Sequence, residues 1–138
     1  MYQDILLPTD GSEASRSAVK HAEEIANKFD ARIHVLFVVN ASTLPDQMAT
    51  GVKMEQMIAT GREVTESIKE ELDAPHIKTT VETGMPHRAI KKYTEEEDID
   101  LVTMGSHGRS GLNRMLLGSV TEKVLRTVEI PVLTAKNE

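Results

Sequence analysis

The sequence has no cysteine and no tryptophan, and it holds only two tyrosines and two phenylalanines among 138 residues. Without cysteine there can be no disulfide, no thiolate metal site and no cysteine nucleophile, and the chain is compatible with a reducing compartment. So few aromatic rings argue against an exposed platform on which nucleic-acid bases would stack. The composition thus disfavours both a cysteine-dependent enzyme and a base-stacking nucleic-acid binder.

Long apolar runs are also missing. None approaches the roughly 20 residues that a membrane-spanning helix needs, so we expect no membrane segment. Residues 1–5 lack the basic and apolar regions of a signal peptide, and cytoplasmic is therefore the expected location. The net charge of -6 gives no sign of nucleic-acid binding. A length of 138 residues predicts a single domain, residues 1–138, that is large enough to bury a core.

Short apolar runs alternate with segments of helical periodicity along the chain. The expected strands cover residues 5–7, 32–39, 77–83, 101–104 and 130–135. The expected helices follow an N-cap at Ser12, span residues 54–72, begin near Pro86 and begin at Val120. Residues 8–11 are typical of a turn, and residues 40–52 of a loop. Repeated strand–helix units predict one doubly wound α/β domain, with a parallel sheet and helices on both faces.

The most informative stretch follows the fourth expected strand. Gly105 and Gly108 end that strand, and Gly118-Ser119 leads into the last helix. Glycines let the backbone approach an anion closely, and the N–H groups that begin a helix carry partial positive charge, so this stretch can cradle phosphate. A tight strand–helix turn of purely structural origin would show the same glycines. The stretch is neither a Walker P-loop nor a Gly-x-Gly-x-x-Gly fingerprint.

Asp10 follows the first expected strand, as Gly105 follows the fourth. In doubly wound sheets, ligands lie beyond the carboxyl ends of the strands at the point where the strand order reverses. If the two strands are neighbours there, both loops meet in one crevice. The Asp10 carboxylate has two interpretations: it caps backbone N–H groups, or it contacts the nucleotide and a divalent cation such as Mg²⁺. We favour the contact with ligand.

The motif Gly-x2-Gly-x9-Gly-Ser, formed here by Gly105, Gly108 and Gly118-Ser119, resembles the signature of the universal stress protein family in its ATP-binding branch. Residues 5–10 (ILLPTD), 104–108 (MGSHG), 117–122 (LGSVTE) and 130–133 (IPVL) are similar to the pattern of the same family. The resemblance covers essentially the whole chain. It departs at Asn40, where some relatives place aspartate after the second strand.

The resemblance implies a Rossmann-like (adenine nucleotide alpha hydrolase-like) three-layer sandwich with a five-stranded parallel sheet of order 3-2-1-4-5. It also implies a homodimer paired through the last strand, whose apolar edge would otherwise be exposed, and ATP with Mg or Mn as the ligand. By the same resemblance, the nucleotide-binding residues would be Pro8, Thr9, Asp10, Val38, Met104, Gly105, His107, Gly108, Arg109, Gly118, Ser119, Val120 and Thr121.

Two classes of function follow. The first is a nucleotide-dependent regulatory module of the stress response, which would act on an unidentified protein partner. The second is a slow ATPase or a self-phosphorylating phosphotransferase, and cyclic AMP is an alternative ligand. Phosphoryl transfer needs a positioned nucleophile and charge stabilisation, and the sequence offers no evident general base, so we assign no catalytic residue. The remaining histidines and the acidic run at residues 95–98 are expected to be structural or solvated.

Overall fold

The computed structural model of the chain describes residues 1–40, 51–106 and 117–136. Strands and helices alternate along it, as the sequence predicts. The elements in chain order are β1 (Asp4–Thr9), the 3-10 helix η1 (Ala14–Ala18), α1 (Val19–Phe29), β2 (Arg32–Val39), α2 (Gly51–Glu71), β3 (His76–Thr83), α3 (Pro86–Glu96), β4 (Leu101–Gly105), α4 (Ser119–Thr127) and β5 (Val132–Ala135).

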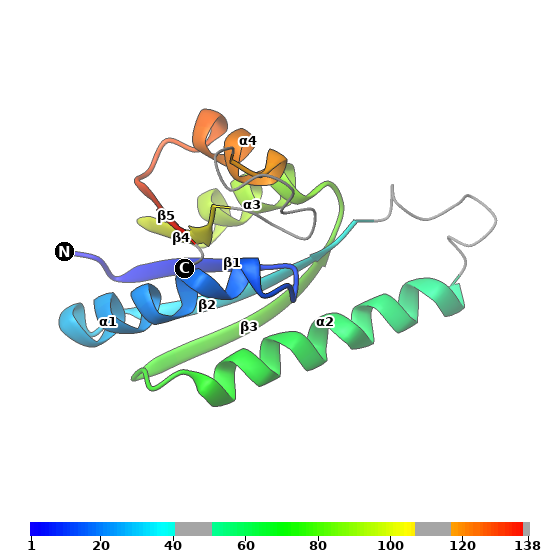
Figure 1. Cartoon of the computed structure of the whole chain (residues 1–138), viewed down its shortest axis with the longest axis horizontal. Coiled ribbons are helices and arrows are strands. Elements are labelled where there is room, and N and C mark those ends of the chain that lie inside the picture. Colours follow the sequence, from blue (N-terminus) through cyan, green and yellow to red (C-terminus); the bar gives the residue numbers. More distant parts are fainter. Residues whose placement is uncertain (41–50, 107–116, 137–138) are drawn as a thin grey trace.

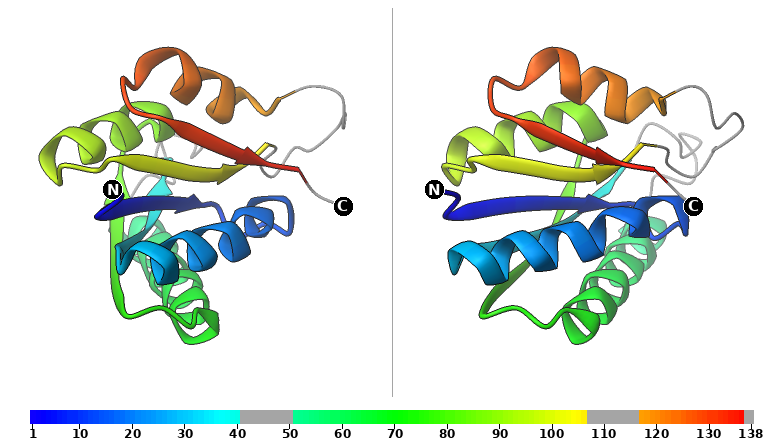
Figure 2. Two further views of the ribbon diagram at one scale, coloured as in Figure 1. Left: turned by 90° about the vertical axis from the view of Figure 1, so that its left-hand side faces the viewer. Right: turned by 60° about the vertical axis from the view of Figure 1, so that its left-hand side comes forward.

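The strands form one parallel sheet in the order β3-β2-β1-β4-β5, which confirms the expected topology. Helices α1 and α2 cover one face of the sheet, and α3 and α4 cover the other (Figures 1 and 2). Strand β1 lies at the centre, between β2 and β4. The outer strands β3 and β5 are the two edges of the described sheet.

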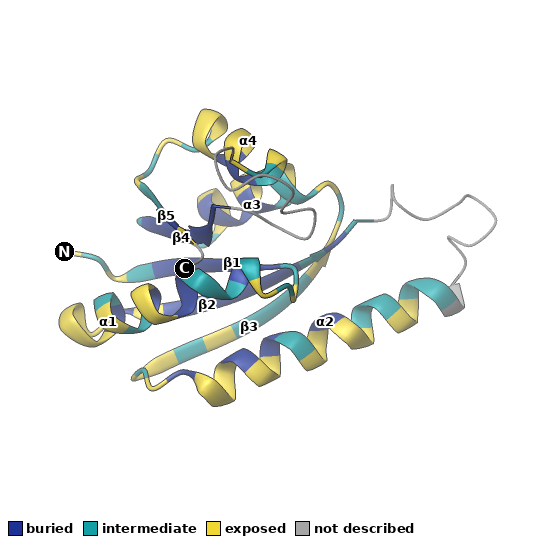
Figure 3. Cartoon of the chain, viewed as in Figure 1, coloured by how far each residue is buried: buried dark blue, intermediate teal, exposed yellow. Residues whose placement is uncertain are grey.

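Two apolar cores hold the layers together, one on each face. Successive side chains of a strand point to opposite faces, so Ile5 and Leu7 of β1 pack towards α1 while Leu6 packs towards α3 and α4. All three are fully buried. The central strands are buried along most of their length, whereas the helices are buried only on their inner sides (Figure 3). Burying each such side chain contributes about 1.5–3 kcal/mol.

Strand β1 is longer than the sequence pattern indicates. The expected turn at residues 8–11 is wrong for Pro8 and Thr9, which continue the strand and pair with Leu36 and Phe37 of β2. Proline lacks a backbone N–H and interrupts a strand that is paired on both sides. Pairing of β1 with β4 involves Ile5 and its neighbour Leu6, so Pro8 lies beyond that ladder. The strand therefore tolerates proline at this position.

Other boundaries also differ from expectation. The hydroxyl of Ser12 accepts a hydrogen bond from the Ser15 N–H at 3.2 Å, but the segment that follows is the 3-10 helix η1 before it becomes α1. Helix α2 already begins at Gly51, within the segment expected to be a loop, and the rest of that loop lies outside the described residues. Strand β5 begins only at Val132, immediately after Pro131.

Acidic residues at the end of α3 do not gather into a metal site. In residues 1–40, 51–106 and 117–136, no group of three or more histidine or carboxylate side chains is placed to hold a metal ion. Glu97 instead accepts a hydrogen bond from Lys78 of β3 at 2.7 Å. Within the same ranges, every helix is too short or too polar to cross a bilayer.

Candidate functional site

The carboxyl ends of β1 and β4 lie side by side at the point where the strand order of the sheet reverses. The two strands pair in parallel, with Ile5 opposite Leu101. From the end of β1 the chain turns into η1 and α1 on one face, and from β4 it goes on to α4 on the opposite face (Figure 1). A crevice for a ligand is expected at this position in a doubly wound sheet. The predicted adjacency of the first and fourth strands is confirmed.

On the β1 side, side chains hold the loop in a tight turn. The Asp10 carboxylate accepts hydrogen bonds from the Ser12 N–H at 2.9 Å and from the Ser12 hydroxyl. The Thr9 hydroxyl accepts from the Gly11 N–H at 3.1 Å and lies 3.1 Å from the hydroxyl of Ser15. Asp10 therefore organises its own loop through Oδ1, in keeping with the capping interpretation, and the same loop carries it to the edge of the crevice.

Hydrogen bonds on the β4 side join the end of the strand to the start of α4. The Gly118 N–H donates to the carbonyl oxygen of Ser106 at 2.7 Å. The hydroxyl of Thr121, a buried side chain, donates to the carbonyl oxygen of Gly105 at 2.9 Å. The Ser106 N–H donates in turn to the carbonyl oxygen of Ala135 in β5, at 2.9 Å. The amino end of α4 is thus fixed directly beyond β4.

Helix α4 begins without a side-chain cap, because its N-cap residue is Gly118. The first hydrogen bond within the helix runs from the Glu122 N–H to the Gly118 carbonyl at 2.9 Å. The N–H groups of Ser119, Val120 and Thr121 have no acceptor inside the helix, as in the first turn of any helix. Such groups, with the helix dipole behind them, favour an anion.

Gly105 has a packing role that the sequence pattern does not disclose. A Cβ atom at this position would lie 2.4 Å from the carbonyl oxygen of Ala14 and 3.1 Å from the Cα atom of Ser15. Strand β4 therefore runs so close to η1 that no side chain fits between them. The glycine is required by the fold whether or not a phosphate approaches it, so the structural interpretation holds for this member of the motif.

The remaining expected site residues occupy different surroundings. Pro8 and Met104 are buried in their strands, and Val38 is half-buried against the core on the α3 and α4 side. His107, Gly108 and Arg109 lie outside the described residues.

Ser15 is the residue that sequence reasoning missed. It touches Thr9 through its hydroxyl and limits the space at Gly105, so it connects the two halves of the crevice. The serines that follow Thr9-Asp10-Gly11 in the sequence were its only signal.

The chain segments at the carboxyl ends of β1 and β4 offer backbone N–H donors and one carboxylate. They can hold an anion, and Asp10 can supply one of the oxygen ligands that a divalent cation takes together with phosphate. A different hollow, of about 560 Å³, lies between β3 and α3, where Thr80 and Tyr93 line it. That hollow is apart from the carboxyl ends of β1 and β4.

Comparison with known proteins finds relatives that align with nearly the whole of this chain. Universal stress protein MJ0531 of Methanocaldococcus jannaschii is 36% identical over 141 residues, which cover 99% of this chain and 83% of that protein. The solved structure of MJ0577, from the same organism, superposes with a TM-score of 0.86 at 33% identity and covers 100% of this chain and 98% of that one.

A universal stress protein solved in complex with cAMP is also similar. It has a TM-score of 0.71 at 27% identity, and the alignment covers 98% of this chain and 97% of that chain. The universal stress protein family as a whole matches residues 1–136. This match spans both halves of the crevice, every strand and every helix described above. The chain therefore belongs to the universal stress protein family.

Proposed function

We propose that this protein binds ATP, with Mg²⁺ or Mn²⁺, in the crevice between the carboxyl ends of β1 and β4. One observation carries the proposal: the bonds from Gly118 to Ser106 and from Thr121 to Gly105 fix the amino end of α4 at the reversal point of the sheet. Backbone N–H groups held in place before a ligand arrives lose little freedom when they bind it. Anion binding by such a helix start needs no lysine.

The proposed contacts divide into two sets. Pro8, Thr9 and Val38 would bound the adenine, and Asp10 would contact the nucleotide or hold the divalent cation. The phosphate side would comprise Met104, Gly105, His107, Gly108, Arg109, Gly118, Ser119, Val120 and Thr121. Since the hydroxyl of Thr121 already bonds to the strand, we assign its phosphate contact to the backbone N–H.

Cyclic AMP is the second candidate ligand, because a related universal stress protein was solved with it. The two ligands differ in their phosphates, and the anchored start of α4 favours the longer phosphate tail of ATP. Competition between them decides: we expect unlabelled ATP with Mg²⁺ to displace a fluorescent ATP analogue at lower concentration than cyclic AMP does. Displacement by cyclic AMP at the lower concentration would reverse the assignment, and no binding of either nucleotide would refute the proposed site.

The proposed role is regulatory rather than catalytic. The Asp10 carboxylate follows β1 and is engaged with Ser12, so it is poorly placed to activate a water molecule. We expect ATP incubated with the protein and Mg²⁺ to remain unhydrolysed over hours while it stays bound. The cytoplasm is the compartment in which such a nucleotide-gated module would meet its protein partner. Steady release of ADP would instead indicate the slow ATPase.

We further propose a homodimer formed through β5. This strand is an edge of the described sheet, and Val132, Leu133 and Thr134 are only half-buried in the single chain. An unpaired edge of this kind favours pairing with a second copy. Sedimentation at micromolar protein concentration is expected to give the mass of two chains, and a monomer under those conditions would contradict the proposal.

A further inference from the structure

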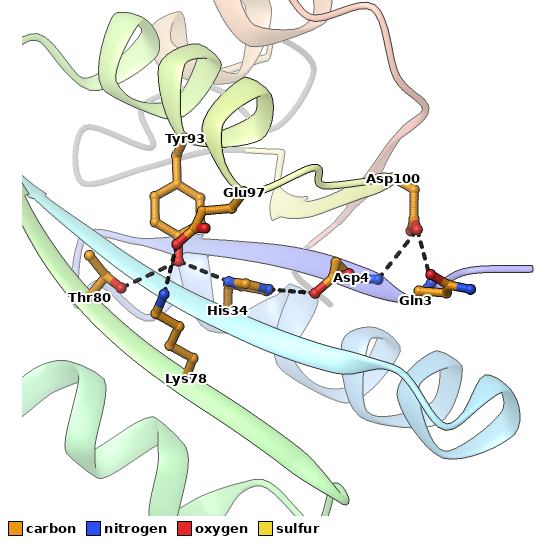
Figure 4. Close-up of polar contacts among 8 residues, drawn as sticks. All are labelled: Gln3, Asp4, His34, Lys78, Thr80, Tyr93, Glu97 and Asp100. Carbon is orange, nitrogen blue, oxygen red and sulfur yellow. Dashed lines mark hydrogen bonds and ion pairs between the residues drawn. The ribbon is translucent and has the colours of Figure 1, made fainter.

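A buried histidine of β2 takes part in a hydrogen-bonded network that links three strands and a helix. His34 of β2 is buried, with 3% of its surface exposed. Its Nε2 atom lies 2.9 Å from the Asp4 carboxylate of β1, and its Nδ1 atom lies 2.8 Å from the Tyr93 hydroxyl of α3. Tyr93 continues the chain to the Thr80 hydroxyl of β3 at 3.3 Å (Figure 4). Hydrogen bonds thus run unbroken from β1 to β3.

The chemistry of these groups fixes where the hydrogens lie when His34 is neutral. An ionised carboxylate only accepts, so Nε2 carries the hydrogen that bonds to Asp4. The other nitrogen, Nδ1, must then accept, and Tyr93 donates to it. Burial raises the pKa of Tyr93 above its ordinary value of 10.0, so the phenol keeps this hydrogen at neutral pH. Having given its own hydrogen to His34, Tyr93 accepts one from Thr80.

Charged side chains surround this hydrogen-bonded network on every element packed against it. Lys78 and Glu97 bridge β3 and α3 above Tyr93, and their hydrogen bond raises the pKa of Lys78 and lowers that of Glu97, so the pair stays ionised near neutral pH. The titratable and charged groups that face the network are Asp4, Arg32, Lys78, Glu82, Tyr93, Glu97 and Asp100. Asp4 alone among them touches the ring as a counter-ion.

We propose that His34 is a proton-operated switch that sets the direction of the Tyr93 and Thr80 hydroxyls. When the ring gains a proton at Nδ1, that nitrogen becomes a donor and Tyr93 must accept from it. Tyr93 then donates its own hydrogen to the Thr80 hydroxyl, and the Thr80 hydroxyl turns its hydrogen away from Tyr93. Every member keeps a partner in both states, and the positive ring keeps Asp4 beside it. The two states therefore exchange without an unsatisfied buried group.

The Thr80 end of this hydrogen-bonded network reaches the surface, so the change in hydroxyl direction is exposed to solvent. Thr80 and Tyr93 both line the hollow between β3 and α3. With neutral His34, both hydroxyl hydrogens point inward, and these two hydroxyls present only oxygen lone pairs to the hollow. With protonated His34, Thr80 offers a hydrogen to the hollow. Solvent there supplies the proton, which passes along the two hydroxyls to Nδ1.

Nuclear magnetic resonance of the intact protein tests the switch directly. With ¹⁵N-labelled histidine, we expect His34 to show hydrogen on Nε2 and none on Nδ1 at neutral pH. On acidification, both nitrogens should become protonated in the folded protein. The ¹³C shifts of Tyr93 Cζ and Thr80 Cβ should change with the same midpoint. The signals of exposed His21 serve as the internal control, since this residue lies outside the hydrogen-bonded network.

The variant Tyr93→Phe keeps the ring but removes the hydroxyl that carries the signal. We expect His34 still to gain its proton in this variant while the response of Thr80 disappears. Three results would overturn the proposal: hydrogen on Nδ1 at neutral pH, a folded protein in which His34 never changes its protonation, or a response of Thr80 that survives Tyr93→Phe. Should that variant fail to fold, the shared midpoint in the unmodified protein decides alone, and different midpoints would refute the switch.

Discussion

Replacing Gly118 with valine is expected to lower the affinity for ATP by roughly a hundredfold while the fold stays intact. Valine would place two methyl groups at the start of α4, where the proposed site brings phosphate against the backbone. Loss of one or two hydrogen bonds to a charged group, each about 1.5–3 kcal/mol, corresponds to a change of this size. Titration of a fluorescent ATP analogue, with and without Mg²⁺, measures it.

Gly118 suits this test because its backbone does not require glycine. Its φ of -63° and ψ of 154° are open to any residue, so Gly118→Val should unfold at nearly the same urea concentration as the unmodified protein. Gly118→Ala provides a graded control, with a smaller loss of affinity because one methyl group intrudes less. Unchanged ATP affinity in the folded valine variant would show that phosphate does not bind at this helix start.

Replacing Gly105 with alanine is expected to destabilise the protein by about 3 kcal/mol, the upper part of the range for overpacking a core. The added Cβ would lie 2.4 Å from the Ala14 carbonyl oxygen. Because that oxygen belongs to the backbone, the overlap can be relieved only if the backbone of β4 or of η1 moves. The free energy of unfolding, taken from urea denaturation without nucleotide, gives the cost. Because no ligand is present, the measurement reports packing alone.

Gly61→Ala is the matched control for that experiment. Gly61 is also buried, and a Cβ there would lie 2.7 Å from Phe37 Cδ1 and 3.1 Å from Val81 Cγ1. These neighbours are side chains, which adjust more easily than backbone, and alanine favours a helix over glycine by about 1 kcal/mol. We therefore expect a loss below about 1 kcal/mol. Equal losses at both glycines would contradict the assigned role of Gly105.

Periodicity and β-branched content were sufficient to predict most elements. Strand β2 has the expected bounds, and β3, expected over residues 77–83, begins one residue earlier at His76. The end of β1 was missed because residue preference places Pro8 in a turn, whereas pairing to β2 keeps it in the strand. Local preference cannot report which neighbours a strand has at each position.

For the candidate site, the sequence predicted which segments meet but not the contacts that hold them together. The spacing of glycines marked the end of β4 and the start of α4, but it could not separate Gly105, which packing requires, from Gly118, whose backbone angles suit any residue. Nor could it show that Thr121 would turn its hydroxyl to the strand, since that contact depends on how α4 docks. The hydrogen-bonded chain through His34 joins residues distant in sequence, and no local pattern marks it.

The bond between Gly118 and Ser106 has a consequence for how this protein can vary. It holds the Gly118 nitrogen 2.7 Å from the Ser106 carbonyl oxygen, so the two residues that flank the segment from residue 107 to residue 117 lie side by side. Closing a longer loop between fixed ends is inexpensive, about 0.6 kcal/mol for each doubling of its length. Insertions and changes of composition there should therefore leave folding almost untouched. Any constraint on the sequence of this segment should then come from the proposed nucleotide contacts of His107, Gly108 and Arg109 rather than from folding.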